Sequence, residues 1–151
     1  MTANAIAEGT TVGIDANVFI GHFTDGSRAI TALLKRVERG ELNGVTTVEA
    51  LHEVLHRLMV VEARVEGAIS GNNPAMRLRR KPEVVRKLRQ YYDDTIAVRA
   101  MGVRVLPPLD DPIRASQRFR SEYGLLVNDS LLAATLVTNG VEVLVTADRD
   151  F

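Results

Sequence analysis

Short apolar runs alternate along the chain with longer segments in which apolar residues recur every three or four positions. The runs at residues 11–14, 103–106 and 141–146 have the length and composition of buried strands, and residues 43–46 form a further brief extended segment. The segments between them show the period of amphipathic helices. Because strands and helices alternate, the pattern predicts an α/β fold with a parallel sheet, covered by helices on both faces through right-handed crossovers.

Start and stop signals divide the helical pattern into segments, and residues 70–74 (SGNNP) break it. Helices are expected at residues 17–23, between the cap Ser27 and the stop Gly40, from Val48 through Met59, at 82–101, at 112–123, and from the cap Asn128 through Val137. In the segment 82–101 the expected apolar stripe consists of Val84, Val85, Leu88, Tyr92, Ile96 and Val98.

The composition narrows the class of protein. With 151 residues and 46% hydrophobic content, the chain fits one compact domain over residues 1–151, with residues 1–9 as a flexible N-terminus. The 19 basic and 19 acidic residues cancel, so no net charge draws the whole molecule to nucleic acid or to an anionic membrane. The sequence has no cysteine, which excludes disulfide frameworks, thiolate zinc sites and cysteine nucleophiles. We expect a cytoplasmic protein without a signal peptide or a membrane span.

Four acidic residues stand where strands end or helices begin: Asp15, Glu53, Asp129 and Asp148. Asp15 closes the first apolar run, and Asp148 follows the last one by two residues. Both are expected at the carboxyl ends of parallel strands, where open α/β sheets bind ligands. Glu53 borders the apolar stripe of its helix and therefore needs a partner. We predict that the four carboxylates meet in one pocket.

Such a pocket implies a particular chemistry. Clustered carboxylates repel one another and lose hydration, so the cluster is tolerated mainly when a cation neutralises it. Hard oxygen ligands favour Mg²⁺ or Mn²⁺, which can activate a water and hold a phosphoryl oxygen during phosphodiester cleavage. The alternative for any one of these acids is a helix cap or a solvated turn residue, as Asp often is.

Three segments of the chain resemble the PIN-domain ribonucleases, a family that includes the VapC-like toxins of toxin–antitoxin modules. They are GIDANVFI at residues 13–20, TTVEALHEVLHRL at 46–58 and VNDSLLAATLVTNGVEVLVTADRDF at 127–151. Residues 60–120 match the family only in general character.

The resemblance implies a three-layer α/β/α sandwich with a central parallel sheet. It implies that Asp15, Glu53, Asp129 and Asp148 are the catalytic and metal-binding acids, with Asn17, Thr46, Thr47 and Asp150 in support. It further implies a Mg²⁺- or Mn²⁺-dependent endoribonuclease, a toxin that forms a homodimer and has an antitoxin protein as partner. A catalytically silent RNA- or partner-binding domain of the same fold is the alternative.

A different motif overlaps Glu53. His52, Glu53 and His56 satisfy the HExxH pattern of zinc metalloproteases, in which two histidines one helical turn apart bind zinc. Such a site needs a third protein ligand, and the candidates His22, Glu62 and Glu66 are poorly spaced for it. We therefore favour a polar helix flank beside the acidic cluster.

The densest positive charge lies in MRLRRKPEVVRKLRQYY, residues 76–92. Its basic residues are predicted to bind RNA phosphates, while Tyr91 and Tyr92 could stack on unpaired bases. The basic residues are Arg77, Arg79, Arg80, Lys81, Arg86, Lys87 and Arg89, with Glu83 the sole acid among them. The alternatives are a solvated helix face and a surface that meets an acidic partner segment.

Overall fold

Four parallel strands form the central sheet of the computed structural model, which describes residues 3–147. The strands are β1 (Thr11–Ile14), β2 (Asn43–Thr46), β3 (Arg104–Val105) and β4 (Val143–Val145). Their order is β3-β2-β1-β4, and each neighbouring pair is parallel. The predicted parallel sheet is therefore confirmed, and each strand lies within its predicted segment.

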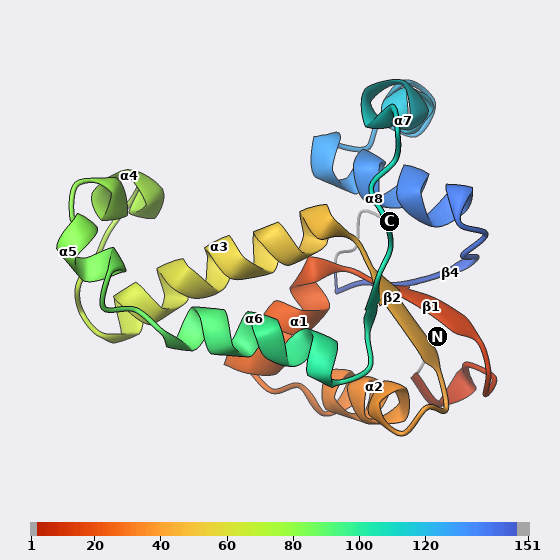
Figure 1. Ribbon diagram of the computed structural model, residues 1–151, viewed down its shortest axis with the longest axis horizontal. Coiled ribbons are helices and arrows are strands. Elements are labelled where there is room, and N and C mark those ends of the chain that lie inside the picture. The colour runs from red at the N-terminus through yellow and green to blue at the C-terminus, as the bar shows by residue number, and fades with distance from the viewer. Residues whose placement is uncertain (1–2, 148–151) are drawn as a thin grey trace.

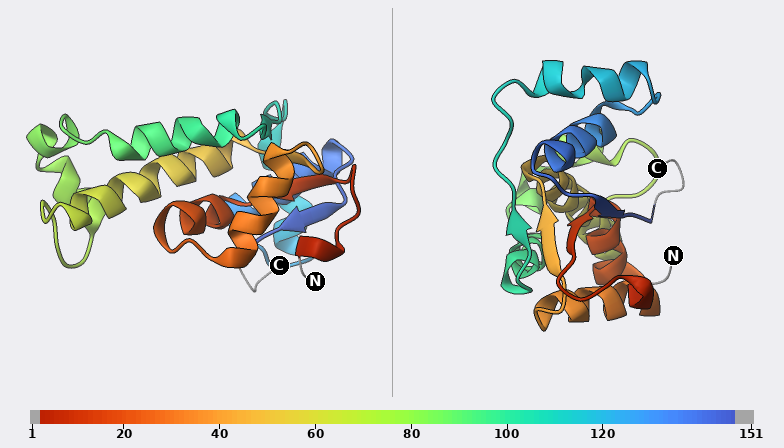
Figure 2. Two further views of the ribbon diagram at one scale, coloured as in Figure 1. Left: turned by 90° about the horizontal axis from the view of Figure 1, so that it is seen from below. Right: turned by 90° about the vertical axis from the view of Figure 1, so that its right-hand side faces the viewer.

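Helices cover both faces of this sheet, as Figures 1 and 2 show. They are the 3₁₀-helix η1 (Ala3–Ala5) and the α-helices α1 (Ala16–Thr24), α2 (Arg28–Glu38), α3 (Val48–Val65), α4 (Pro74–Arg79), α5 (Pro82–Val85), α6 (Gln90–Ala100), α7 (Pro112–Ser121) and α8 (Val127–Thr138). In the right-hand view of Figure 2, α7 and α8 lie on one side of the sheet and α1 and α2 on the other. The three-layer α/β/α architecture is thus confirmed. Among the described helices, none combines the length and apolar composition that a bilayer crossing requires.

The alternation of side chains along β1 builds two separate cores. Val12 and Ile14 are fully buried in a cluster with residues of α1, α2, α3 and α6. Gly13 points to the opposite face, where its register partner Val45 packs with Leu136 of α8. Because β1 is covered on both faces, its sequence is a continuous apolar run rather than an alternating one.

An antiparallel pair of helices extends away from the sheet. Helices α3 and α6 pack side by side, and α4 and α5 join their far ends (Figure 1). This end has its own hydrophobic cluster, formed by Val60, Ala63, Ile69, Leu78 and Leu88. We call α3, α6, α4 and α5 together the arm.

One predicted helix is wrong. The segment 82–101, expected to be continuous, is divided into α5 and α6 by a turn at residues 86–89. Because of the break, a different set of α6 residues from the one we predicted faces the interior. Tyr91, Thr95 and Val98 face inward, whereas Tyr92 and Ile96, which we expected on the stripe, are 54% and 52% exposed.

A carboxylate on α3 holds this break in place. Glu62 accepts hydrogen bonds from the backbone N–H groups of Arg89 at 2.9 Å and Tyr91 at 2.8 Å. Burial alone would raise the pKa of the Glu62 carboxyl. The backbone N–H groups of Tyr91, Arg89 and Gln90 and the charge of Arg89 together outweigh burial and lower this pKa.

Replacement of Glu62 by glutamine is expected to loosen the arm. A neutral amide accepts these hydrogen bonds more weakly, so we expect a loss of about 1 kcal/mol in stability. Since the folded-state pKa is lowered, the contribution of Glu62 is complete above the ordinary pKa of 4.5 and disappears as the pH falls through the folded value. Hydrogen-exchange protection of the Tyr91 amide should therefore fall in acid in the natural protein, and be low and pH-independent in Glu62→Gln.

The exposed Glu66, one turn further along, gives the control Glu66→Gln, which should leave the protection of Tyr91 unchanged. Equal protection of this amide in all three proteins would contradict the role of Glu62.

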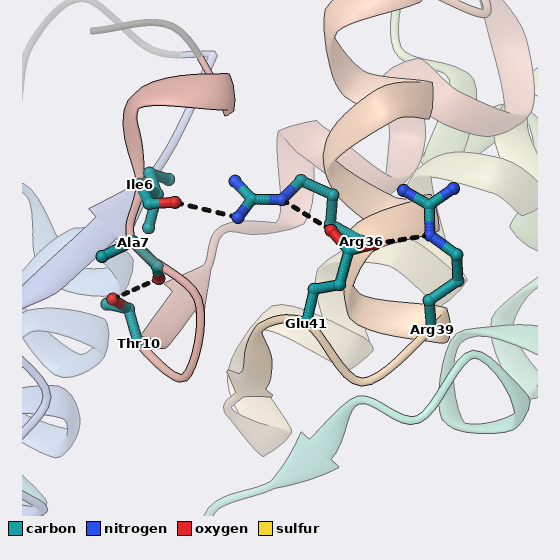
Figure 3. Close-up of polar contacts among 6 residues, drawn as sticks. All are labelled: Ile6, Ala7, Thr10, Arg36, Arg39 and Glu41. Atoms are coloured by element: carbon teal, nitrogen blue, oxygen red, sulfur yellow. Dashed lines mark hydrogen bonds and ion pairs between the residues drawn. The ribbon is translucent and has the colours of Figure 1, made fainter.

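The N-terminal segment, which we expected to be flexible, makes defined contacts from residue 6 onward. Arg36 of α2, which is 9% exposed, donates one hydrogen bond to the Ile6 carbonyl at 2.9 Å and another to Glu41 at 3.1 Å (Figure 3). The Gly9 N–H donates to the Glu41 carbonyl at 2.8 Å. These contacts attach residues 6–9 to α2 and to the start of β2.

Candidate functional site

The candidate site lies at the edge of the sheet where its strands end. Asp15 directly follows β1, Thr47 follows β2, and Thr146 follows β4. Since all strands are parallel, these three residues meet at the same edge.

Asp15 is held by its own helix and by the neighbouring strand. It is the N-cap of α1, and its Oδ1 accepts a hydrogen bond from the Ala16 N–H at 2.7 Å. Its Oδ2 accepts a hydrogen bond from the Thr146 hydroxyl at 2.8 Å. The residue is only 7% exposed. Capping and this second hydrogen bond therefore fix the carboxylate in one orientation.

Asn17 connects the same strand ends. Its Nδ2 donates to the Thr146 hydroxyl oxygen at 3.2 Å, and its Oδ1 accepts from the Ala147 N–H at 2.9 Å. This side chain thus fixes the chain just after β4, immediately before Asp148 in the sequence.

The two threonines at the end of β2 have different positions. The fully buried Thr46 donates its hydroxyl to the Ile14 carbonyl at 2.8 Å, which ties β2 to the end of β1. Thr47 caps α3 by accepting from the Ala50 N–H at 3.1 Å, and it lines the pocket beside Asp15. Of the two, Thr47 is the one at the candidate site.

Helix α3 carries Glu53 to the pocket from a second direction. Its carboxylate lies 3.6 Å from the guanidinium of Arg57, one turn further along the helix. This contact supplies the partner that a carboxylate beside the apolar stripe requires. Because the glutamate side chain is 35% exposed, the pair adds little to stability.

Helix α8 carries Asp129 in its first turn, although the expected cap is wrong. The helix begins at Val127 with Leu126 at the N-cap position, so Asn128 lies inside it. The hydroxyl of the buried Ser130 donates to the Val127 carbonyl and accepts from Arg120 of α7 at 2.8 Å. These bonds secure the first turn in place of an asparagine cap.

Three of the predicted acids therefore line one pocket. It is bounded by Asp15, Thr47, Glu49, Ala50, Glu53, Asn128, Asp129 and Leu132. Within residues 3–147, no group of three or more histidine or acidic residues is close enough to hold one metal ion together. The carboxylate oxygens that face the pocket are nonetheless the donor type that Mg²⁺ and Mn²⁺ prefer. Asp148 and Asp150, the other predicted acids, lie outside the described residues.

Two residues of this region were not predicted. Glu49 lines the pocket, and its sequence signal is its position one helical turn before Glu53. Thr146 bonds to Asp15 because β1 and β4 are neighbours with Ile14 opposite Val145. Its only signal was a polar side chain at the last position of the apolar run 141–146.

The HExxH motif lies on the exposed side of α3. His52, Glu53 and His56 line a shallow pocket next to the acidic one. Among the described residues, none completes a metal site with these two histidines. Of the proposed third ligands, Glu62 is bonded to the backbone of the arm. The structure thus gives the metalloprotease hypothesis no support.

The seven basic residues predicted to bind RNA do not lie at the acidic pocket. They lie on α4, in the link between α4 and α5, and in the turn before α6, at the far end of the arm (Figure 1). All seven are exposed. Of the two tyrosines after them, Tyr91 is packed in the arm, whereas Tyr92, which we expected on the apolar stripe, faces solvent.

Comparisons with known proteins identify the family. A search of the curated proteins found no match. The family model of the PIN domain, however, matches residues 12–151, which is most of the chain and extends from within β1 past β4. The chain therefore belongs to the PIN-domain family, whose members are generally metal-dependent nucleases that act on RNA.

Proposed function

We propose that the protein is a Mg²⁺- or Mn²⁺-dependent endoribonuclease with Asp15, Glu53, Asp129 and Asp148 as its catalytic, metal-binding acids. The observation that carries the proposal is that Asp15, Glu53 and Asp129 come from three different elements and line one pocket at the carboxyl edge of the sheet. Carboxylates that line one pocket offer the oxygen ligands that a divalent cation binds.

The chemistry of the donor set supports this proposal. When bound, Mg²⁺ or Mn²⁺ supplies the positive charge and Lewis acidity that phosphodiester hydrolysis requires. The buried Asp15 offers a carboxylate whose orientation is fixed by Thr146 and by the start of α1. Asp129 lies in the first turn of α8, where the N-terminal end of the helix favours a negative charge. Asn17 and Thr47 are proposed to support these acids by fixing the strand ends, with Thr46 behind them and Asp150 as a further acid.

Removal of divalent ions is expected to abolish cleavage. With a mixed RNA substrate and Mn²⁺, fragments should accumulate, and EDTA should lower their rate of formation by about 10²-fold or more, since the cation contributes several kcal/mol to the reaction. Readdition of Mn²⁺ after EDTA serves as the control and should restore the rate.

Two outcomes would contradict the proposal. Cleavage that continues unchanged in EDTA would exclude a metal-dependent reaction. RNA binding that needs no divalent ion, without any cleavage in Mn²⁺ or Mg²⁺, would instead identify a catalytically silent RNA-binding domain.

We further propose that the nuclease is the toxin of a toxin–antitoxin pair and acts on cytoplasmic RNA as a homodimer, with an antitoxin protein as partner. The support for this role is the resemblance of residues 13–20, 46–58 and 127–151 to the PIN-domain ribonucleases, a family that includes the VapC-like toxins. The role requires that expression of the protein arrests growth through its nuclease activity.

A further inference from the structure

The far end of the arm is strongly basic in a chain without net charge. Residues 74–89, called the basic tip below, comprise α4, α5 and the turn that follows. They contain seven of the 19 basic residues of the chain but only one acid, Glu83. Such a local concentration of positive charge attracts polyanions even when the whole molecule is neutral.

The tip is a fixed structure rather than a loose loop. Leu78 and Leu88 are buried against Val60 and Ala63 of α3. Three of the basic residues also bond to backbone carbonyls within the arm: Arg77 to Asn72 at 2.7 Å, Lys81 to Ala68 at 2.9 Å, and Arg89 to Arg86 at 2.9 Å. These three cations stabilise the tip itself.

The other four cations are available for an external partner. Arg79, Arg80, Arg86 and Lys87 are all exposed. Their side chains make no hydrogen bond or ion pair with any residue in the described range 3–147. Four cations without a partner in that range, grouped at the end of α4 and in the turn after α5, form a surface suited to a row of phosphates.

The tip and the acidic pocket lie on the same face of α3. Glu49, Glu53, His56, Val60 and Ala63 are spaced by three or four residues, so they form one stripe along the helix. At one end of this stripe Glu49 and Glu53 line the acidic pocket, and at the other Val60 and Ala63 are buried in the cluster of the tip. In Figure 1, α4 and α5 likewise stand on the same side of α3 as α8.

The surface between the two ends is open to a strand of RNA. A shallow pocket lined by His52, His56 and Arg57 continues from Glu49 and Glu53 along α3 towards the tip. With a helical rise of about 1.5 Å per residue, Val65 lies roughly 18 Å from Glu53 along the axis. At roughly 3.4 Å per phosphate of a stacked strand, this distance corresponds to about five phosphate spacings.

We propose that the basic tip is a second RNA-binding site, which holds phosphates about five or more nucleotides from the bond that the acidic pocket cleaves. The proposal rests on the ribonuclease function proposed above and specifies its substrate class. The preferred substrates are RNA strands long enough to reach from the pocket to the tip. Shorter RNA meets only the acidic pocket and loses the contribution of the tip.

A binding experiment in EDTA tests the tip separately from cleavage. The probes are fluorescein-labelled single-stranded RNAs of mixed sequence with about 5 and about 25 nucleotides. At the phosphate spacing used above, the first is too short to reach from the acidic pocket to the tip and the second is long enough. The test variant replaces Arg79, Arg80, Arg86 and Lys87 by glutamine. The control variant replaces Arg28, Lys35, Arg99 and Arg104 by glutamine; these residues are also exposed but lie on α2, α6 and β3.

We expect the tip variant to bind the long RNA at least about tenfold more weakly than the natural protein does. Its slope of log K against log salt should be smaller by about 2–3, because each lost phosphate contact of a single strand contributes about 0.7. The control variant should retain most of the affinity for the long RNA. In Mn²⁺, the tip variant should lose kcat/KM for the long RNA by a similar factor but cleave the short RNA at the natural rate.

Equal loss of long-RNA affinity in the tip and control variants would overturn the proposal in favour of a non-specific charge effect. Polyglutamate serves as a further probe, which stands for an acidic protein. If the tip variant binds the long RNA as the natural protein does but no longer binds polyglutamate, the proposal is overturned in favour of an acidic protein partner. Because binding is measured in EDTA, absence of cleavage in the natural protein would refute the nuclease function without deciding the role of the tip.

Discussion

Replacement of Asp15 by asparagine is expected to lower the rate of RNA cleavage by about 10²–10³-fold, the effect of losing several kcal/mol of electrostatic stabilisation at a metal-dependent site. The fold should survive, since the amide oxygen can still cap α1 at the Ala16 N–H, where the aspartate bond is 2.7 Å long. Cleavage of a labelled RNA in Mn²⁺, together with a thermal melt, measures both properties.

The matched control is Asp25→Asn at the exposed C-cap of α1, which should cleave at the natural rate. In cells, expression of the natural protein should arrest growth and the Asp15→Asn variant should not. Undiminished cleavage by Asp15→Asn would refute the proposed site. Growth arrest that persists in a variant without nuclease activity would refute only the toxin mechanism.

Replacement of Gly13 by alanine is expected to destabilise the protein by about 1–3 kcal/mol through overpacking. A Cβ at this position would lie 2.7 Å from Cδ1 and 2.8 Å from Cδ2 of Leu136. Leu136 is only 4% exposed, so its methyl groups have little room to move. The expected decrease in melting temperature lies between a few degrees and about 10 °C. Since Leu136 and Asp129 lie on the same helix, cleavage should also weaken at temperatures where the variant is folded.

Gly44→Ala provides the control on the opposite face of the sheet. A Cβ there would lie 2.7 Å from Cγ1 of Val37 on α2, so a comparable loss of stability is expected without displacement of α8. In a Leu136→Ala background, Gly13→Ala should be nearly neutral, because the crowding is removed. If Gly13→Ala melts at the same temperature as the natural protein, the contact between β1 and α8 is looser than described.

Local sequence signals were sufficient to predict the strands and the position of Asp15. The apolar run at residues 11–14 matches β1, because a strand covered on both faces needs apolar residues at each position. An acid placed directly after such a strand must lie at its carboxyl end. The family resemblance had the same basis, since it rests on the strand and helix ends around Asp15, Glu53 and Asp129.

Contacts between distant residues decided the features that were not predicted. The break between α5 and α6 contains no glycine, and it depends on Glu62, which lies 27 and 29 residues before the two amides that it binds. Thr146 meets Asp15 only because β4 pairs with β1 across 131 residues of sequence. The helix that carries Asp129 begins before Asn128 because its first turn is secured by Arg120 of α7 through Ser130.

The separate hydrophobic cluster of the basic tip makes the molecule modular. Tyr91 is the described side chain that packs against both this cluster and the larger core beside β1. Substitutions among the exposed residues of the basic tip are therefore expected to leave the sheet and its acidic pocket undisturbed. Under the proposed function, selection could therefore change which nucleic acids the tip binds without altering the acids of the pocket.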